Sequence, residues 1–416
     1  MRNFILIIVF SLFIPGVCFA VPPGISQEIS YEDNSGVWHK HNDYLIPNSK
    51  ETKAIFSLDQ ERDYASSDID ADGVENNLDP SPYDWREIGY QPFGMLAFLS
   101  WDHDWNSFKY SQKNLARIVK MLKDAGVSFV RMDFLWQDIE PKKGEFDFTK
   151  YDYILDLLSR ENIRILGVLS YSVSWAGKNW NAPPDNHYDF VDYVSAVVSR
   201  YKDRIKYWEI WNEPDSRTYW DPQDDMKTYT ELLKLCYVAA KMIDPSCKIL
   251  IGGMTVTGYY AIQNVYRNGG KDYFDVINIH PFVNPLDPTT YKTIGAICKN
   301  LDKLKYQYGD YEKKIWLTEI GCPGLRTRMK SEGWWSGVSP TERQQTKFLD
   351  YVFSDVIELP NVEKVFWAFF RDNKDHFGND VDYFGLIRWN FSKKPSYKMY
   401  RKRFLIWDKQ YKKAAK

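Results

Sequence analysis

The sequence predicts an α/β fold, a (β/α)8 TIM barrel with an extended N-terminal arm. Three observations lead to this prediction. Short apolar runs alternate with segments of helical periodicity, eight such runs occur, and no glycine-rich phosphate loop follows the first run. The near-continuous apolar character of the runs is typical of parallel strands covered on both faces, and the missing phosphate loop argues against a doubly wound sheet. We expect the barrel to occupy residues 89–410.

Each apolar run ends where turn residues or polar residues begin, which sets its expected bounds. The eight expected strands are Phe93–Phe98, Val127–Asp133, Ile163–Tyr171, Ile205–Asn212, Lys248–Met254, Asp275–His280, Lys314–Glu319 and Glu363–Phe369.

Helical periods lie between these runs. Ser111 and Gly126 are the expected cap and stop of one helix, whose apolar positions follow i, i+3, i+4, i+7 spacing: Leu115, Ile118, Val119 and Leu122. A second set, which ends before Gly309, is Ile294, Ile297, Leu301 and Leu304. The run Ser339-Pro340-Thr341-Glu342 predicts a capping box with proline at the first helical position, and a helix toward Leu359.

The composition is that of a globular protein. The chain has 416 residues, of which 44% are hydrophobic and 26% charged. Its formal net charge of -2 predicts no bulk attraction to nucleic acid or to an anionic membrane. The 16 Trp, 29 Tyr and 24 Phe exceed what core packing needs, so we expect some of them to line a binding surface.

Residues 1–20 have the pattern of a secretory signal peptide. Arg2 precedes a short apolar stretch, Phe4–Ile14, and small residues end the segment before Val21. The alternative is a retained membrane anchor, but the apolar stretch is short for a bilayer span. We expect a secreted or periplasmic protein with no membrane contact beyond this leader.

Residues 21–88 form a polar arm without a sustained period, and the arm contains a calcium-like loop at 68–79. Oxygen ligands stand at positions 1, 3, 5, 7 and 12, with Gly73 at the sharp turn. The loop resembles those of thrombospondin type 3 and dockerin repeats, although its last ligand is Asp and no helices flank it. A structural Ca²⁺ is expected, with a solvated acidic turn as the alternative; the ligands would be Asp68, Asp70, Asp72, Val74 and Asp79.

Cysteine and histidine give no sign of a catalytic metal. The sequence contains no HExxH motif and no close Cys/His cluster. The four cysteines beyond the leader could form zero, one or two disulfides, and the sequence does not select among these: Cys236, Cys247, Cys298 and Cys322.

Polar residues stand at the carboxyl ends of the expected strands, where barrels carry their functional groups. Two of them, Glu213 and Glu319, end the fourth and seventh strands. Two carboxyl groups that face each other across a barrel mouth can cleave an acetal between sugars, one as an acid and one at the anomeric carbon. The other strand-end residues are Arg131, Asp133, Asn212, His280 and Trp367.

Four segments resemble clan A glycoside hydrolases, with families 39 and 5 as the nearest in look. They are YWEIWNEPD (Tyr207–Asp215), KIWLTEIG (Lys314–Gly321), VRMDFLWQDIEPKKGEFDF from Val130 and DVINIHPF from Asp275. The resemblance runs from about Phe93 to about Ile406 and covers neither the leader nor the arm.

The resemblance implies a role for each matching residue. Glu213 would be the general acid/base and Glu319 the nucleophile of a retaining double displacement. Asn212 would bind the sugar 2-hydroxyl, and Arg131 would keep the nucleophile ionised. His280 matches the sixth-strand His of the clan, whereas many relatives carry Tyr at the position of Phe282.

Two tryptophans, Trp367 and Trp175, are expected to stack on sugar rings, although a large apolar residue in a strand is core by default. Further loop aromatics are weaker platforms: Trp101, Trp220, Trp334 and Trp335.

The predicted function is that of a secreted retaining β-glycosidase acting on a poly- or oligosaccharide, without a catalytic cofactor. Two alternatives remain open, a non-catalytic carbohydrate-binding barrel and a calcium-dependent surface protein, because a barrel fold hosts many functions. The sequence discloses neither the sugar nor whether cleavage is exo or endo.

Overall fold

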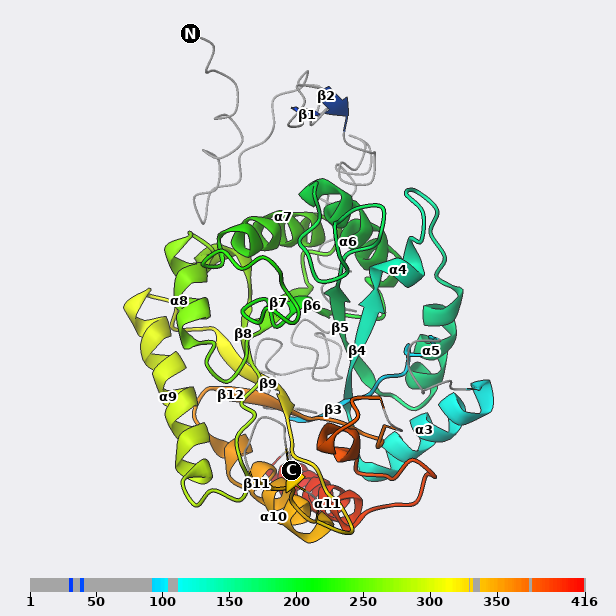
Figure 1. Ribbon diagram of the computed structural model, residues 1–416, viewed down its shortest axis with the longest axis vertical. Helices are drawn as coiled ribbons and strands as arrows, with labels where there is room; N and C mark the ends of the chain where they lie inside the picture. The colour runs from blue at the N-terminus through cyan, green and yellow to red at the C-terminus, as the bar shows by residue number, and fades with distance from the viewer. Residues whose placement is uncertain are drawn as a thin grey trace.

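The computed structural model describes residues 30–32, 38–40, 92–103, 111–328, 330–331, 337–373 and 376–414. These residues contain a closed barrel of parallel strands in the order β12-β3-β4-β5-β6-β7-β8-β9 (Figure 1). The TIM-barrel prediction is confirmed, and all eight expected strands are present with slightly different ends. The barrel strands are β3 (Phe93–Leu96), β4 (Phe129–Leu135), β5 (Arg164–Ser170), β6 (Tyr207–Asn212), β7 (Lys248–Gly253), β8 (Val276–Ile279), β9 (Lys314–Ile320) and β12 (Val362–Trp367).

Helices surround the strands on the outside of the barrel (Figure 1). The α-helices are α3 (Gln112–Ala125), α4 (Trp136–Ile139), α5 (Thr149–Arg160), α6 (His187–Tyr201), α7 (Lys227–Ile243), α8 (Tyr259–Arg267), α9 (Thr290–Gln307), α10 (Glu342–Val352) and α11 (Pro395–Ala414). Short 3-10 helices are η2 (Lys271–Tyr273), η3 (Val356–Glu358) and η4 (Asp380–Tyr383), and a small hairpin pairs β10 (Lys330–Ser331) with β11 (Gly337–Val338).

Helix ends follow the expected chemistry with one correction. Ser111 caps α3 by accepting from the Asn114 N–H, and Gly126 ends the helix at φ 91°. The capping box of α10 lies two residues later than predicted. Thr341 is the cap and pairs reciprocally with Gln344, so the helix begins at Glu342 and the predicted box at Ser339 was wrong.

Ser339 has a different partner in the structure. It is fully buried and its hydroxyl donates to Asp380 Oδ2 at 3.0 Å. α10 ends at Val352, and the short η3 carries the chain on toward Leu359.

Only two short stretches of the predicted arm are described. β1 (Ser30–Glu32) and β2 (Trp38–Lys40) form an antiparallel pair. The signal-peptide segment 1–20 and the calcium-like loop 68–79 lie outside the described residues.

The amino-terminal half of the barrel interior is filled by apolar side chains. Seven strands contribute one residue each to this floor: Phe129, Leu166, Tyr207, Leu250, Val276, Trp316 and Phe366. Gly94 of β3 takes the eighth place, since a Cβ there would lie 2.4 Å from the Phe366 ring. Because side chains alternate along a strand, residues two positions further on also point inward, and these form the base of the site.

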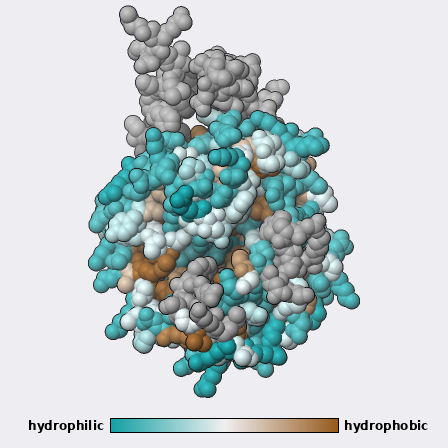
Figure 2. Space-filling view, viewed as in Figure 1, coloured by the Kyte–Doolittle hydropathy of each residue, from teal (hydrophilic) through white to brown (hydrophobic). Residues whose placement is uncertain are grey.

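The four cysteines beyond the leader are buried and free: Cys236, Cys247, Cys298 and Cys322. Of the three alternatives, zero, one or two disulfides, the structure has zero among these four. Within the described ranges, no helix is long and apolar enough to cross a membrane. The face shown in Figure 2 is mostly hydrophilic, with hydrophobic residues in a few small patches.

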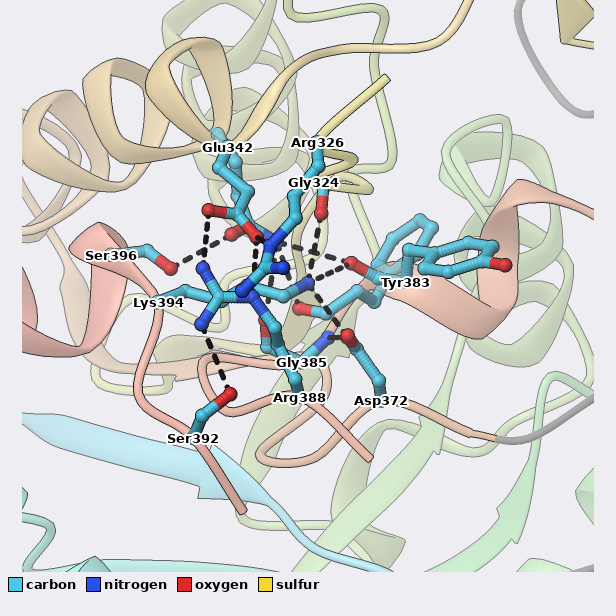
Figure 3. A network of polar contacts seen from close by, with 12 residues as sticks. Gly324, Arg326, Glu342, Asp372, Tyr383, Gly385, Arg388, Ser392, Lys394 and Ser396 are labelled. Atoms are coloured by element: carbon cyan, nitrogen blue, oxygen red, sulfur yellow. Dashed lines mark hydrogen bonds and ion pairs between the residues drawn. The ribbon is translucent and has the colours of Figure 1, made fainter. Parts of the chain in front are cut away.

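A polar network joins the segments that follow β9 and β12 (Figure 3). The fully buried Lys394 ammonium donates to Asp372 Oδ1 at 2.7 Å and to the carbonyls of Gly324 and Tyr383 at 3.0 and 2.8 Å. All three of its N–H groups are therefore satisfied. Burial lowers the pKa of Lys394 and raises that of Asp372 to about 6, while their mutual attraction favours the charged pair.

Two further residues complete this rim network. Arg388 donates to both carboxylate oxygens of Glu342, at 2.8 and 2.7 Å. Gln345 donates to the carbonyls of Cys322 and Phe384 at 3.0 and 3.1 Å. The network fixes both segments at the carboxyl ends of the strands that carry Glu319 and Trp367.

Candidate active site

The site is centred on Arg131, which projects inward from β4 two residues beyond the floor residue Phe129. Its guanidinium donates to both oxygens of Glu209 at 2.8 Å, to Asn212 Oδ1 at 2.8 Å and to Glu319 Oε1 at 2.6 Å. Burial disfavours the cation, but the charges of Glu209 and Glu319 outweigh it and raise the pKa of Arg131. Arg131 is thus a fixed positive charge in contact with β6 and β9.

Glu209 is a site residue that the sequence analysis missed. It is fully buried on β6, two positions beyond Tyr207, and also accepts from the Gly253 N–H at 2.9 Å. The signal was present, because alternation places Glu209 on the same inward face as Tyr207. An inward carboxylate in a barrel needs a cationic partner, and Arg131 is the partner.

The end of β6 departs from regular strand geometry. Trp211 and Glu213 have φ values of 68° and 44°, in the left-handed region that non-glycine residues seldom adopt. Such conformations cost about 1–3 kcal/mol each and persist where the surrounding structure holds them, often at functional sites. The break in alternation lets Asn212 contact Arg131 while Glu213 contacts His280.

A bulge in β9 turns Glu319 toward the barrel axis. Val365 pairs with Leu317 and Trp367 with Ile320, so one residue more lies on β9 than on β12. Bulges re-aim side chains in this way. Thr318 and Glu319 therefore both point inward, and Glu319 reaches Arg131. Burial raises the pKa of Glu319 above its ordinary value, opposed by the charge of Arg131.

Glu213 lies in an environment that favours its protonated form. Its Oε1 is 2.8 Å from His280 Nδ1, and its side chain is 14% exposed. Burial, together with the charge of Asp215, raises the pKa of Glu213 to about 8. Asp215 is held in place by the Thr255 N–H and hydroxyl, both of which donate to it.

A chain of hydrogen bonds joins His280 to Thr318 and Asn278 and favours one tautomer of the ring. The Thr318 hydroxyl donates to Asn278 Oδ1 at 2.6 Å and therefore accepts from His280 Nε2–H at 3.0 Å. Burial lowers the pKa of His280, so the ring is neutral and Nδ1 carries a lone pair. The contact with Glu213 is then a hydrogen bond when Glu213 carries the proton and donates it.

Gly253 makes room for this arrangement. A Cβ at this position would lie 2.0 Å from His280 Nε2. Only a residue without a side chain allows the imidazole to lie against β7 here.

The two predicted catalytic carboxyl groups lie beside the same histidine. His280 Nδ1 lies 2.8 Å from Glu213 Oε1 and 3.9 Å from Glu319 Oε1, so these oxygens are at most 6.7 Å apart, the sum of the two distances. Retaining glycosidases hold their carboxyl groups about 5–5.5 Å apart and inverting ones about 6.5–9.5 Å. The bound on this pair of oxygens includes the retaining separation.

The structure brings together five of the predicted site residues, and their individual roles stay predictions: Arg131, Asn212, Glu213, His280 and Glu319. Phe282 packs with its ring centroid 6.4 Å from that of His280 and 5.9 Å from that of Phe384. It supplies no hydroxyl to either carboxyl group.

The two predicted stacking tryptophans lie elsewhere. Trp367 is fully buried, packs against Phe348 and donates from Nε1 to the Phe384 carbonyl at 3.1 Å. Trp175 is half-buried against Trp136 and donates to the Glu140 carbonyl at 3.0 Å. The contacts of both among the described residues are with other groups than the carboxyl pair, and sugar stacking by either stays a prediction.

The other loop tryptophans also differ in position. Trp101 Nε1 donates to Asp133 Oδ2 at 2.8 Å, next to the Arg131 strand end. Burial raises the pKa of Asp133, against the charge of Arg131. Trp220 is fully buried against Trp211 and is a core residue rather than a sugar platform. Trp334 and Trp335 lie outside the described residues.

Metal ligands are not grouped in the described part of the chain, where no cluster of three or more His, Cys, Asp or Glu could hold an ion.

Comparison with known proteins places the chain in a family. Residues 104–169 match a glycosyl hydrolase family described as β-galactosidase. Residues 171–386, more than half of the chain, match the family described as glycosyl hydrolase catalytic core. The chain belongs to this family. It is a glycoside hydrolase, and the predicted enzyme class is confirmed.

Individual relatives of this glycoside hydrolase are distant. An endo-1,4-β-xylanase of Humicola insolens is 25% identical over 120 residues, which cover 27% of this chain and 32% of the xylanase. The chain thus aligns with less than a third of that relative.

Solved structures share the fold. A family 39 glycoside hydrolase of Bacteroides cellulosilyticus WH2 has a TM-score of 0.61 and 23% identity over 75% of this chain and 63% of its own. A family 5 structure of Streptomyces cattleya has a TM-score of 0.58 and 14% identity, covering 77% and 80%. The predicted likeness to clan A is confirmed.

Proposed function

We propose that this glycoside hydrolase is a retaining β-glycosidase that cleaves O-glycosidic bonds in a poly- or oligosaccharide of xylan or galactoside type. The observation that carries the proposal is that two neighbouring carboxyl groups have different partners. Glu319 contacts a fixed cation, whereas Glu213 faces the lone pair of a neutral imidazole. Environments that separate two carboxyl groups in this way assign an acid and a nucleophile.

The proposed reaction has two displacement steps. The Glu319 carboxylate attacks the anomeric carbon while Glu213 gives its proton to the departing oxygen, which leaves a glycosyl-enzyme ester. The Glu213 carboxylate then takes a proton from water, whose oxygen attacks the same carbon and releases Glu319. Arg131 holds Glu319 in its attacking position, and Asn212 binds the sugar hydroxyl beside the reacting carbon.

The proposal is supported by the separation of at most 6.7 Å between the two carboxyl oxygens. The sugar class is supported by the β-galactosidase description of residues 104–169 and by the xylanase among the relatives. The presence of both carboxyl groups, Glu213 and Glu319, beside the same histidine favours an enzyme over a non-catalytic sugar-binding barrel.

Azide rescue tests the two roles separately. We expect Glu319→Ala and Glu213→Ala to lose turnover of 2,4-dinitrophenyl β-D-xyloside and β-D-galactoside, at the first and the second step respectively. Azide should restore both, giving the α-glycosyl azide with the Glu319 variant and the β-glycosyl azide with the Glu213 variant. The same anomer from both variants would contradict the assignment, and no turnover of any β-glycoside by the unchanged protein would contradict the function.

We also propose that residues 1–20 direct export and are removed. The supporting observation is the charged start, the short apolar stretch and the small-residue exit described above. Amino-terminal sequencing of exported protein should begin at Val21. Mature protein that retains the leader would favour the membrane-anchor alternative.

A further inference from the structure

We propose that Trp180, Tyr171 and Tyr219 form a binding site for a sugar ring of the leaving group, beside Glu213. This site rests on the hydrolase function proposed above and adds to it the surface that selects the departing sugar. The three aromatic residues come from the segments that follow β5 and β6.

The first observation is an exposed indole in contact with two tyrosines. Trp180 is 51% exposed, although its ring centroid lies 5.1 Å from that of Tyr171 and 6.3 Å from that of Tyr219. The two tyrosine rings are nearly parallel, 6.2 Å apart at 21°. A flat apolar face left open in this way matches the C–H face of a pyranose ring.

The second observation is that the tyrosine hydroxyls are available. Among the described residues, neither Tyr171 nor Tyr219 donates its hydroxyl proton to a protein atom. The ring centroid of Tyr171 lies 5.7 Å from that of Trp211, two residues before Glu213. Burial and the charge of Glu213 raise the pKa of Tyr219. Burial and the charges of Asp133 and Glu213 raise the pKa of Tyr171. The cluster therefore offers polar groups for sugar hydroxyls next to the proposed acid.

The third observation is the direction in which the cluster lies. In the barrel order, β5 is next to β6, which carries Glu213, and stands opposite β9, which carries Glu319. A sugar chain whose reacting unit lies against Glu319 and whose departing oxygen meets Glu213 continues toward the β5 side. The acid protonates the oxygen between these two units, so a surface beyond it binds the leaving group.

The fourth observation is that the surface is held in place before a ligand binds. The Trp180 carbonyl accepts from the Ser172 N–H at 2.8 Å. Asn181 donates from its side chain to the Thr218 carbonyl at 3.2 Å, which ties the two segments together. Trp211 donates from Nε1 to the Tyr219 carbonyl at 2.8 Å, which links the cluster to the strand end that carries the acid. Preorganisation of this kind lowers the cost of binding.

The test compares two leaving groups on the same sugar. For xylose, β-D-xylosyl fluoride is compared with β-1,4-xylobiose as separate substrates. For galactose, β-D-galactosyl fluoride is compared with β-1,4-galactobiose. Fluoride occupies no sugar site, so we expect Trp180→Ala to lower kcat/KM of the disaccharide about ten-fold more than that of the fluoride. Trp180→Phe, which keeps a flat ring, should recover part of this difference.

Tyr311→Ala is the matched control, because Tyr311 is 55% exposed and lies between α9 and β9, at the opposite end of the barrel. This substitution should leave kcat/KM unchanged for both the fluoride and the disaccharide. An equal loss on both leaving groups, or no loss on the disaccharide, would overturn the proposed site while leaving the hydrolase function intact.

A second measurement does not depend on turnover. Titration calorimetry with the Glu319→Gln protein and xylotetraose or β-1,4-galactotetraose should show about ten-fold weaker binding when Trp180 is also changed to Ala. Equal affinity with and without Trp180 would overturn the site. Absence of both turnover and binding would contradict the proposed function itself.

Discussion

Replacement of Thr318 by Val tests the hydrogen-bond chain behind the proposed acid. The change removes the hydroxyl that accepts from His280 Nε2–H at 3.0 Å and keeps the shape of the side chain. Thr318 is fully buried. Without its hydroxyl, the Nε2–H group of His280 would lose its acceptor in the His280–Thr318–Asn278 hydrogen-bond chain. An unsatisfied buried donor costs about 1–3 kcal/mol, which disfavours this tautomer by the same amount.

The sign of the resulting pH effect follows from the other tautomer. With the proton on Nδ1, His280 donates to Glu213 and stabilises its carboxylate, so the pKa of Glu213 falls from about 8. One pKa unit corresponds to about 1.36 kcal/mol, so we expect a fall of about 1 to 2 units. Activity that needs the protonated acid is present below this pKa and is lost as the pH rises through it. In the variant, this alkaline loss of activity should therefore occur at a lower pH.

The assay is the pH dependence of kcat/KM on phenyl β-D-xyloside and phenyl β-D-galactoside, whose poor leaving group needs the acid. Thr318→Ser restores the hydroxyl and should restore the alkaline limb. The other charges that face His280 are the same in all variants: Arg131, Glu209, Asp215 and Glu319. An alkaline limb that does not move, or a ¹⁵N spectrum that shows the Nδ1–H tautomer of His280 in the unchanged protein, would refute the reasoning.

Three further predictions concern stability. Glu209→Ala leaves the buried guanidinium of Arg131 with fewer partners and should lower the free energy of unfolding by about 3–5 kcal/mol in a urea titration, more than Glu209→Gln; equal stability would show that Glu209 is dispensable. Lys394→Met leaves Asp372 without its cation and should cost about 3 kcal/mol or more by the same measurement, and a neutral effect would indicate that the rim network adds no stability. Removal of calcium with EDTA should lower the melting temperature through the loop at 68–79 while the kcat of the folded enzyme stays the same; loss of kcat without a change in melting temperature would favour the calcium-dependent surface protein.

The barrel itself could be predicted because its strands and helices differ in apolar period. The positions of Glu213 and Glu319 could also be predicted, since both end a strand of the barrel. Glu209 could have been found from alternation with Tyr207, but it lies inside the strand, before the strand-end residues Asn212 and Glu213. The geometry at Trp211 could not be predicted, because a positive φ at a bulky residue is held by tertiary contacts rather than by local preference.

Other differences have the same physical origin. The bulge that turns Glu319 inward depends on the register between β9 and β12, which no local sequence signal specifies. The buried position of Trp367 depends on the segment that supplies the Phe384 carbonyl. The contact of Trp180 with two tyrosines depends on how two loops pack together, so no local pattern around Trp180 indicates a binding surface.

The rim network makes the two sides of the barrel mouth unequal as targets for engineering. After Glu319, the chain is held by the buried Lys394, whose three N–H groups are all hydrogen-bonded. Insertions or substitutions there would break its ion pair with Asp372. On the side of Trp180, the fastening consists of main-chain and amide bonds near the surface. Libraries that seek new donor or acceptor preferences should therefore diversify residues 173–182 and 216–219 and leave Asp215, Trp220, 322–326 and 383–396 unchanged.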